Sequence, residues 1–338
     1  MKGEMLNNPL YIGSFPPPYG GVTVKNALLF EAISEKMQLD KLNLMDVKHH
    51  DLAAIAAFAK AVTGRNGVLL IGVSSDWRRR ITDFLYRFNR SKMSRSLLFV
   101  MGGMVPNDEA YAKRLGCYRC VFVETQGMRE AFERAGTRNV AVYPNCRKRP
   151  ATPCHVRKTD KRGVRLVYFS LISEDKGAQL TIDAAKELSN CSFTFYGPID
   201  APYKEKFMRE VACLPNVEYR GLFDSVSGDV VSELNQYDIH LFPTMCPNEG
   251  VPGVIVETKL AAVPTIASNR GYNSELINNG KDGVLTCRDT VDELVDVISS
   301  LAASPEQLDS MKEAALLSAD FFYVERYLDT ISEVLQER

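Results

Sequence analysis

The sequence predicts an α/β protein of two domains, each built on a parallel sheet with helices on both faces. Short apolar segments of strand length alternate with amphipathic helical segments along most of the 338 residues. Near-continuous apolar strands of this kind are typical of parallel sheets that are buried on both faces. The alternation stops once, in a polar basic stretch, and then restarts. A chain of this length also exceeds what one hydrophobic core usually fills.

The expected strands of the first half are 10–15, 67–73, 96–102, 119–124 and 139–143, and those of the second half are 164–170, 191–196, 216–221, 238–242 and 263–267. A helix is expected from about Val22 to Met37, and another from about Val324 to Leu335, because apolar residues recur there at helical spacing. The stretch 146–163 has two prolines and few large apolar residues, and is predicted to be a linker. We therefore expect an N-terminal domain in 1–150 and a C-terminal domain in 151–320. Residues 321–338 should form a helix that either domain could receive, so it can cross back to the first.

The composition, 45% hydrophobic and 25% charged, is ordinary for a globular protein. No stretch approaches the roughly 20 apolar residues of a membrane span. The first residues lack the basic flank and apolar run of a secretory signal, so a cytoplasmic location is expected. Eight scattered cysteines are then expected to be reduced thiols. Cys117 and Cys120 form one C-x-x-C pair, but a zinc site needs a second closely spaced pair, so no metal and no cofactor are expected.

The near-neutral total charge hides an asymmetry between the halves. Residues 1–150 hold 23 Lys and Arg against 13 Asp and Glu, a formal charge of +10, whereas the remainder holds 18 against 29, or −11. Such a split suggests that the first half meets something anionic. Ordinary variation between two domain surfaces is the alternative explanation.

The most informative segment is 238–285. A strand should end at Phe242, a loop rich in Pro, Asn and Gly follows, and a helix should start near Gly253 after Pro252. Ligands of doubly wound sheets bind at the carboxyl ends of strands, and a helix N-terminus favours phosphate. Glu249 in the loop and Glu257 in the helix could hold sugar hydroxyls and a ribose diol. They could equally be a solvated loop carboxylate and a helix surface residue.

This segment resembles the donor site of the retaining glycosyltransferases of family four, which have the GT-B fold of two Rossmann-like doubly wound domains facing each other across a cleft. The family pattern places two glutamates, separated by seven residues, in E-G-F-P-G-x-x-x-E, followed by A-x-G-x-P-V-I-A-S. The matching residues here are Glu249, Gly250, Val251, Pro252, Gly253 and Glu257, followed by 261–268. The pieces 272–275 and 280–283 also match. The resemblance covers essentially the whole chain and is strongest in the second half. It implies that the domain in 1–150 binds the acceptor and that the domain in 151–320 binds the nucleotide-sugar.

The segment 164–188 is similar to the family's strand–loop–helix with G-R-L-x-x-x-K-G. Lys176 and Gly177 match, and the resemblance implies that the lysine pairs with the donor diphosphate. Leu171 stands at the usual arginine position, which is a departure that should weaken diphosphate binding or shift the task elsewhere. Gly197 and Gly221 end the strands that the resemblance places beside the nucleotide base. A plain turn would explain either glycine alone.

In the first half, Gly20 and Gly21 resemble the family's glycine loop over the donor phosphates, and they precede a helix, where anions bind readily. Met101 occupies the position of the family's histidine in H-G-G, so that imidazole is absent. The segment 140–146 matches V-x-V-I-P-N. The resemblance therefore implies catalytic roles for Glu249 and Lys176. Donor binding is implied for Gly20, Gly21, Lys176, Gly197, Gly221, Glu249, Gly250, Val251, Pro252, Gly253, Val254 and Glu257.

The basic segment 76–96 mixes cations with large apolar residues. Its arginines Arg78, Arg79, Arg80 and Arg87 are predicted to face the acceptor or an anionic membrane surface. A solvated helix on an α/β domain is the alternative. Nucleic acid is not expected as a partner, because no recognised binding module accompanies the charge.

The expected function is a retaining, metal-independent transfer of a sugar from a nucleotide-sugar, with UDP as the expected nucleotide. The acceptor should be a glycan or a lipid-diphosphate-linked glycan of surface polysaccharide synthesis, and a peripheral location on the cytoplasmic face of the inner membrane is expected for such an acceptor. Two alternatives remain open: a GT-B epimerase or phosphorylase acting on a nucleotide-sugar, and a degenerate, non-catalytic GT-B binding protein. Leu171 and Met101 favour the degenerate protein, whereas intact Glu249, Lys176 and Glu257 oppose it.

Overall fold

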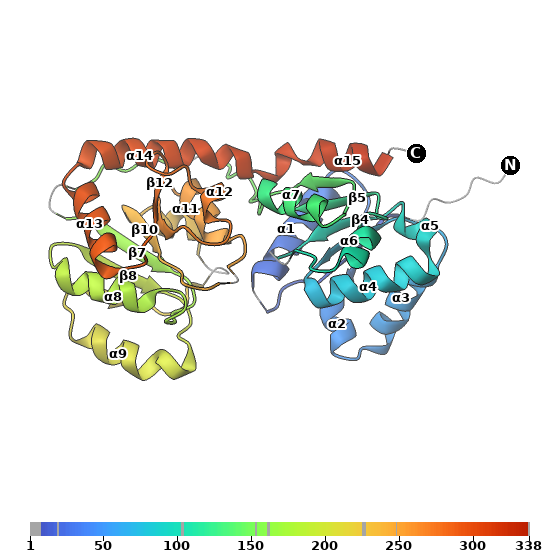
Figure 1. Ribbon diagram of the computed structural model, residues 1–338, viewed down its shortest axis with the longest axis horizontal. Helices are drawn as coiled ribbons and strands as arrows, with labels where there is room; N and C mark the ends of the chain where they lie inside the picture. Colours follow the sequence, from blue (N-terminus) through green and yellow to red (C-terminus); the bar gives the residue numbers. More distant parts are fainter. Residues whose placement is uncertain are drawn as a thin grey trace. The chain divides into compact units, whose positions relative to one another are not determined.

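A computed structural model of the chain describes residues 8–18, 20–102, 105–152, 154–160, 163–224, 228–247 and 249–336. Of the positions in the segments singled out above, 103, 104, 153, 161, 162, 248, 337 and 338 lie outside these ranges. The chain divides into two compact units (Figure 1). The first contains residues 1–149 together with 322–338, and the second contains residues 150–321.

The first unit is built on a parallel sheet whose described strands follow the order β2-β1-β3-β4-β5-β6. The strands are β1 (Leu10–Gly13), β2 (Asp40–Asn43), β3 (Leu69–Val73), β4 (Leu97–Val100), β5 (Cys120–Val123) and β6 (Val140–Val142). The helices are α1 (Gly21–Ser34), α2 (Leu44–Lys48), α3 (Leu52–Thr63), α4 (Ser75–Phe88), α5 (Arg90–Met93), α6 (Glu109–Leu115), α7 (Gln126–Arg134) and α15 (Leu328–Gln336), with a 3-10 turn at Val324–Arg326. The chain reverses its direction of travel across the sheet between β1 and β3.

Helix α1 lies unusually close to the centre of this sheet. The Tyr11 hydroxyl donates a 2.8 Å hydrogen bond to Oδ1 of Asn26, on the buried side of α1. A Cβ at Gly72 in β3 would lie 2.0 Å from the same Oδ1, so only glycine allows this approach. The small residue in the strand therefore fixes where α1 crosses the sheet.

The C-terminal segment belongs to the core of the first unit. Val324, Leu328 and Ile331 are buried in the cluster that also contains Phe99 and Phe122 from the strands. The Arg119 guanidinium donates hydrogen bonds of 3.2 and 3.0 Å to the carbonyls of the last turns of α15. The helix expected at Val324 to Leu335 is thus a 3-10 turn followed by α15, and it packs on the N-terminal half of the sequence (Figure 1).

The second unit has a parallel sheet in the order β12-β11-β10-β7-β8-β9 over its described residues. The strands are β7 (Arg165–Phe169), β8 (Ser192–Tyr196), β9 (Val217–Tyr219), β10 (Ile239–Phe242), β11 (Thr265–Ser268) and β12 (Gly283–Thr286). The helices are α8 (Ala178–Glu187), α9 (Lys204–Ala212), α10 (Val230–Leu234), α11 (Gly253–Leu260), α12 (Asn273–Leu276), α13 (Val291–Ala302) and α14 (Pro305–Ser318), with 3-10 turns at Ala201–Tyr203 and Ala319–Phe322. This strand order is that of a Rossmann sheet, which reverses between β7 and β10.

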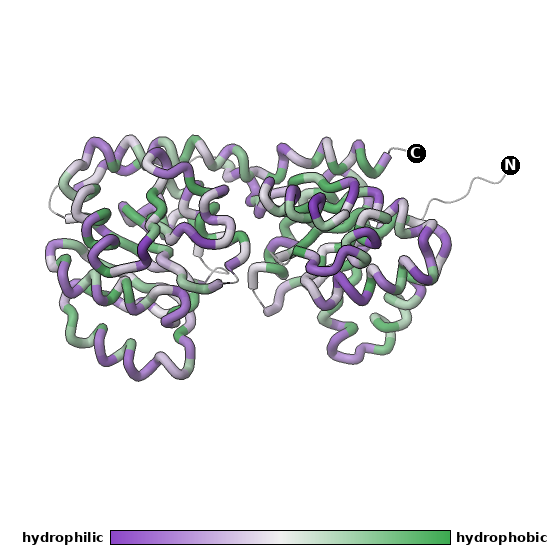
Figure 2. Tube along the Cα trace, in the orientation of Figure 1, coloured by the Kyte–Doolittle hydropathy of each residue, from purple (hydrophilic) through white to green (hydrophobic). Residues whose placement is uncertain are grey.

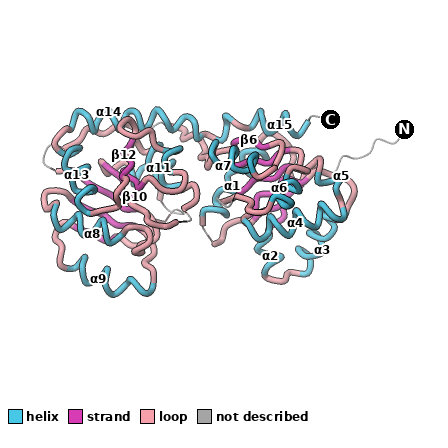
Figure 3. Tube along the Cα trace, viewed as in Figure 1, coloured by secondary structure: helices cyan, strands magenta, loops and turns pink. Residues whose placement is uncertain are grey.

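Both faces of the second sheet are buried because side chains alternate along each strand. Leu166, Tyr168 and Phe195 point into the cluster that α8 and α13 complete. Val167 and Tyr196 point to the other face, where Leu234 of α10 joins them. Figures 2 and 3 show the result, with apolar strands enclosed by helices that are polar on their outer sides. The predicted α/β class with doubly wound sheets is confirmed.

The sequence patterns missed one edge strand in each sheet. In β2 the burial alternates little, with two exposed residues out of four, so no apolar run marks it. In β12 only the first and last residues are buried. An edge strand has a neighbour on one side only and is covered less completely, which explains why these two strands lack the apolar signal of the central ones.

Among the described residues, no helix combines the length and apolar character needed to span a membrane.

The buried histidine of β10 makes the stability of the second unit depend on pH. His240 is fully buried, its Nδ1 lies 3.1 Å from Oγ1 of Thr265, and burial lowers its pKa from 6.5 to about 3. The unfolded chain takes up a proton near pH 6.5, but the folded chain does not do so until about pH 3. Folding therefore loses stability from this group as the pH falls from about 6.5 towards 3.

We expect the urea midpoint of the wild type to fall more steeply below pH 6.5 than that of His240→Leu, which has no group to titrate there. The midpoint of the variant relative to that of the wild type should rise as the solution is acidified from pH 8. Urea unfolding at four values between pH 8 and 4.5 measures it. Parallel curves would show that His240 does not control the pH dependence.

Candidate functional site

The reversal of strand order in the second sheet places two loops side by side. One loop follows β7 and leads to α8, and the other follows β10 and leads to α11. In open parallel sheets the crevice at such a reversal, at the carboxyl ends of the strands, is where ligands bind. Nζ of Lys176 from the first loop lies 2.6 Å from Oε2 of Glu249 in the second. The fold thus brings the two predicted catalytic residues into direct contact.

The Lys176–Glu249 pair is largely withdrawn from solvent, with side-chain exposures of 21% and 9%. The Thr244 hydroxyl donates a second hydrogen bond, of 2.7 Å, to the same Glu249 oxygen. Thr244 is in turn held by Ser268, whose hydroxyl donates to the Thr244 carbonyl at 2.5 Å. The carboxylate therefore has a fixed position at the reversal point, set by groups at the carboxyl ends of the three neighbouring strands β7, β10 and β11.

Close backbone contacts hold the two loops together. The Met245 N–H donates to the Asp175 carbonyl at 2.8 Å. Gly177 has a positive φ of 76°, and a Cβ there would lie 2.0 Å from the Pro243 carbonyl oxygen. The Tyr168 hydroxyl donates to the carbonyls of Leu171 and Lys176, at 2.9 and 3.1 Å, and burial raises its pKa so that it remains a donor. Lys176 is thus presented by a loop with little freedom to move.

Two helix N-termini begin at this edge of the sheet. α8 starts directly after Gly177, and α11 starts after Pro252, whose extended backbone caps it. A helix N-terminus has unpaired N–H groups and a partial positive charge, and both favour a bound phosphate. Val251 is buried, whereas Gly250, Pro252, Gly253, Val254 and Glu257 are half-buried. An ammonium and two helix ends around one carboxylate are suited to an anionic ligand that also carries hydroxyls.

Gly197 and Gly221 lie together at the ends of β8 and β9. The Gly197 N–H donates to the Gly221 carbonyl at 2.9 Å, and both residues have positive φ. A Cβ at Gly197 would lie 1.8 Å from the Ser170 carbonyl oxygen, whereas one at Gly221 would meet nothing within 4 Å. Leu171, at the position where the resemblance predicts arginine, is 41% exposed at the same edge.

In the first unit, Gly20 caps α1 and Gly21 is its first residue. The Thr23 hydroxyl accepts from the Gly20 N–H at 3.0 Å and donates to the Pro18 carbonyl at 2.8 Å, so the glycine turn is tied to the helix. Met101 is 4% exposed and packs in the core at the end of β4.

The prediction that Arg78 faces an acceptor or a membrane is wrong. Its residue exposure is 4%, and its guanidinium lies 5.7 Å from the centre of the Phe132 ring, inside the first unit. Arg78 lies on the side of α4 that packs on the domain, together with the buried residues Ile81 and Thr82 at i+3 and i+4. Arg79, Arg80 and Arg87 are exposed, and Arg79 also lies 3.7 Å from Asp108.

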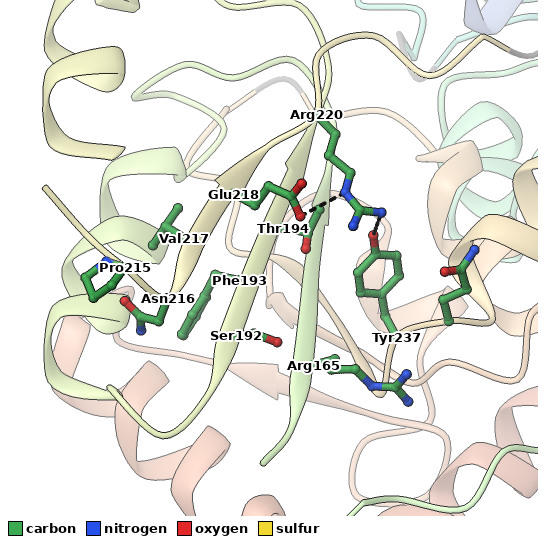
Figure 4. Close-up of a pocket in the computed structure, with 11 residues that line it drawn as sticks. Arg165, Ser192, Phe193, Thr194, Pro215, Asn216, Val217, Glu218, Arg220 and Tyr237 are labelled. Carbon is green, nitrogen blue, oxygen red and sulfur yellow. Dashed lines mark hydrogen bonds and ion pairs between the residues drawn. The ribbon is translucent and has the colours of Figure 1, made fainter. Parts of the chain in front are cut away.

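A separate polar cavity of about 310 Å³ lies in the second unit (Figure 4). Its lining includes Arg165 and Ser192, the first residues of β7 and β8, so it extends towards the amino ends of the strands rather than the reversal point. Arg165 pairs with Asp238 at 3.1 Å and Arg220 with Glu218 at 2.9 Å. Because both guanidinium groups are neutralised by neighbouring carboxylates, this cavity is a weaker candidate for an anionic ligand.

Thr244 and Ser268 were not singled out in the sequence. Both are polar residues at or just after the carboxyl end of a buried strand, β10 and β11. That position was a usable signal, because side chains there reach the ligand edge of a parallel sheet. What the sequence could not show is that both would support the same carboxylate.

Comparison with known proteins agrees with this geometry. Residues 163–304, which lie within the second unit, match the sequence family described as glycosyl transferases group 1. An uncharacterised 41.2 kDa protein in the cps region of Klebsiella pneumoniae is 24% identical over 149 residues. That alignment covers 44% of this chain and 39% of the relative, so it spans well under half of the relative's length.

Solved structures resemble the whole chain. HepE of Anabaena in complex with UDP and glucose has a TM-score of 0.70 at 16% identity, over 98% of this chain and 100% of that one. The apo form of the lipopolysaccharide outer core galactosyltransferase WaaB has a TM-score of 0.66 at 14% identity, over 97% and 99%. The chain therefore has the GT-B fold of these structures.

Two glycines have almost the same positive φ but differ in their surroundings. Substituting each of them by alanine therefore distinguishes the effect of the close loop contact on stability from the effect of φ alone. Gly177 and Gly221 have φ of 76° and 77°, but only at Gly177 would an added Cβ collide with backbone. We expect Gly221→Ala to cost about 1 kcal/mol of unfolding free energy from the strained φ. Gly177→Ala should cost at least twice as much, because the loops after β7 and β10 must also separate. Chemical unfolding of both variants measures the difference, and equal losses would refute the tight loop contact.

Proposed function

We propose that the chain is a retaining, metal-independent glycosyltransferase that takes a sugar from a UDP-sugar bound at the Lys176–Glu249 pair. The observation that carries the proposal is the 2.6 Å contact between these residues at the strand reversal, in a segment that matches the glycosyl transferases group 1 family. UDP is proposed as the nucleotide because HepE, which shares the fold, forms complexes with UDP and with UDP-glucose.

On this proposal the donor diphosphate lies against the N-termini of α8 and α11, and Lys176 turns from Glu249 towards it. The ammonium and the helix ends then neutralise the charge that develops on the departing UDP, which makes a bound metal ion unnecessary. Preorganised charge of this kind is often the largest contribution to catalysis. Glu249 would then accept hydrogen bonds from sugar hydroxyls, and Glu257 would hold the ribose diol.

The reaction exchanges one bond at the anomeric carbon for another. The oxygen of the acceptor hydroxyl bonds to that carbon, while the bond from the carbon to the β-phosphate oxygen breaks. If the acceptor enters on the face that the UDP leaves, the configuration is retained, and the released phosphate oxygen can take the hydroxyl proton. The chain then needs to supply orientation and charge stabilisation rather than a covalent nucleophile.

The proposed acceptor is a glycan of a surface polysaccharide, free or linked to a lipid diphosphate. Two comparisons support this: the relative in the cps region, and the galactosyltransferase of the lipopolysaccharide outer core. A lipid-linked acceptor would bring the protein to a membrane surface, and the first unit has a surface suited to one.

That surface is a stripe of five residues along α4, Trp77, Arg80, Phe84, Arg87 and Phe88, spaced so that they share one side of the helix. Arg80 and Arg87 are exposed, and Phe88 is 67% exposed. The Trp77 ring contacts Phe58 of α3, with 5.7 Å between ring centres. Exposed aromatic residues between cations are typical of segments that lie on anionic lipid, and we propose that the α4 stripe does so.

A thermal-shift comparison of UDP, GDP and ADP tests the donor site. We expect UDP to raise the midpoint of the wild type, Lys176→Met to lose most of this shift, and Glu257→Ala to reduce it, because ligand stabilisation scales with affinity. EDTA should leave the UDP shift unchanged. Lys186→Met is the matched control, since Lys186 lies on α8 but pairs with Asp183 and Glu210 instead. No shift with any nucleotide, or equal shifts in all variants, would contradict the proposal.

Co-sedimentation with vesicles tests the α4 stripe. The wild type should bind vesicles containing anionic phosphatidylglycerol at low salt, and Arg80→Glu/Arg87→Glu should bind at least tenfold less. Lys36→Glu/Lys204→Glu makes the same charge change at exposed lysines outside the stripe and should bind like the wild type. Equal loss in both double variants would show that only total charge matters.

A further inference from the structure

A second carboxylate lies at the ligand edge of the first sheet, outside every site described above. Glu124 is the residue directly after β5, and its side chain is 4% exposed. Oε1 accepts a 2.5 Å hydrogen bond from Nζ of Lys25, on the second turn of α1, and the Lys25 side chain is 12% exposed. The position of α1 over the sheet, fixed at Asn26 and Gly72, is what brings this ammonium to the carboxylate.

The other oxygen of Glu124 is not satisfied. Oε2 is buried and has no hydrogen-bond partner among the described residues. Buried carboxylates in proteins normally have partners at both oxygens, because leaving an acceptor of this strength unpaired is costly. The ion pair alone does not explain why the carboxylate is present, because apolar side chains can replace a buried ion pair at little cost in stability. An unpaired buried oxygen at a ligand edge therefore points to a hydrogen-bond donor that arrives with a ligand.

The surroundings restrict what that donor can be. Glu124 and Lys25 line a small cavity with Met101, Phe122 and Tyr143, at the carboxyl ends of β4, β5 and β6. Its volume is about 10 Å³, which is room for one water-sized group. The aromatic and thioether walls exclude bulk water, which strengthens a hydrogen bond to the carboxylate. A single hydroxyl fits these requirements.

We propose that Oε2 of Glu124 binds a hydroxyl of the acceptor saccharide, and that Lys25 is a positioning residue that holds the carboxylate in place. The inference rests on the proposed transferase function and adds an acceptor contact in the first unit to the donor contacts in the second. It predicts that Glu124 matters for the acceptor and not for the donor.

The test separates these two steps by using UDP-sugar hydrolysis by water and transfer to octyl glycosides (glucoside, galactoside, mannoside and N-acetylglucosaminide). Glu124→Gln should keep the UDP thermal shift, and its hydrolysis rate should stay within twofold of the wild type. Its KM for the best glycoside should rise roughly 10- to 100-fold, the loss expected for a hydrogen bond to a charged group. Glu130→Gln, six residues further on in α7 and exposed, is the matched control and should behave like the wild type.

Unchanged acceptor kinetics in Glu124→Gln would overturn the inference, and so would a parallel loss of hydrolysis, which would place the residue in the donor site or the fold. In either case the wild type still turns over donor, so the proposed function stands. A wild type that hydrolyses no UDP-sugar would instead refute the proposed function and this inference with it.

A second variant needs no acceptor. Lys25→Met/Glu124→Met replaces the pair with apolar side chains. If the carboxylate is kept for a ligand, the melting temperature should stay within about 2 °C of the wild type or rise, with the UDP shift intact. A fall of more than about 4 °C would show that the pair is structural and would overturn the inference.

Discussion

The ion pair between Lys176 and Glu249 joins the two loops at the point where the second sheet reverses its strand order, and several surrounding contacts hold the pair in place. Thr244 and Ser268 fix the carboxylate, while Gly177 allows the loop that carries the lysine to approach the backbone after β10. A buried pair of this kind is a weak source of stability, because the desolvation of both charges offsets their attraction. The position of the pair beside two helix N-termini is better explained by a bound ligand, which would take the place of Glu249 as the partner of Lys176.

The sequence predicted the central strands, because these depend on local apolar runs, whereas Lys176 and Glu249 were singled out by the family resemblance. It missed β2 and β12, whose partial exposure removes the apolar run. It also misplaced Arg78, since a basic run gives no sign of which arginine faces inward. Contacts between distant segments, such as Lys25 with Glu124, 99 residues apart, could not be predicted without the strand order.

The positive charge of the first half is partly internal to that unit. Lys92 is buried and donates to the Ala61 carbonyl at 2.6 Å, and Arg114 lies 3.3 Å from Asp83. The positive charge that can meet an anionic surface is therefore smaller than the count of residues suggests. The exposed arginines of α4 are the clearest source of this charge. Each unit thus presents a different chemistry at its ligand edge: an ammonium and helix ends in the second, and a partly unpaired carboxylate among aromatic rings in the first.

The most direct test of the account is a double-mutant cycle on UDP affinity, measured by calorimetry for the wild type, Lys176→Met, Glu249→Gln and the double variant. If the two side chains form one site, the effects of the single changes should depart from additivity by more than about 0.5 kcal/mol, the range expected for residues in contact. Additive effects, or UDP affinities that do not change in any variant, would contradict the claim that this pair is where the donor binds.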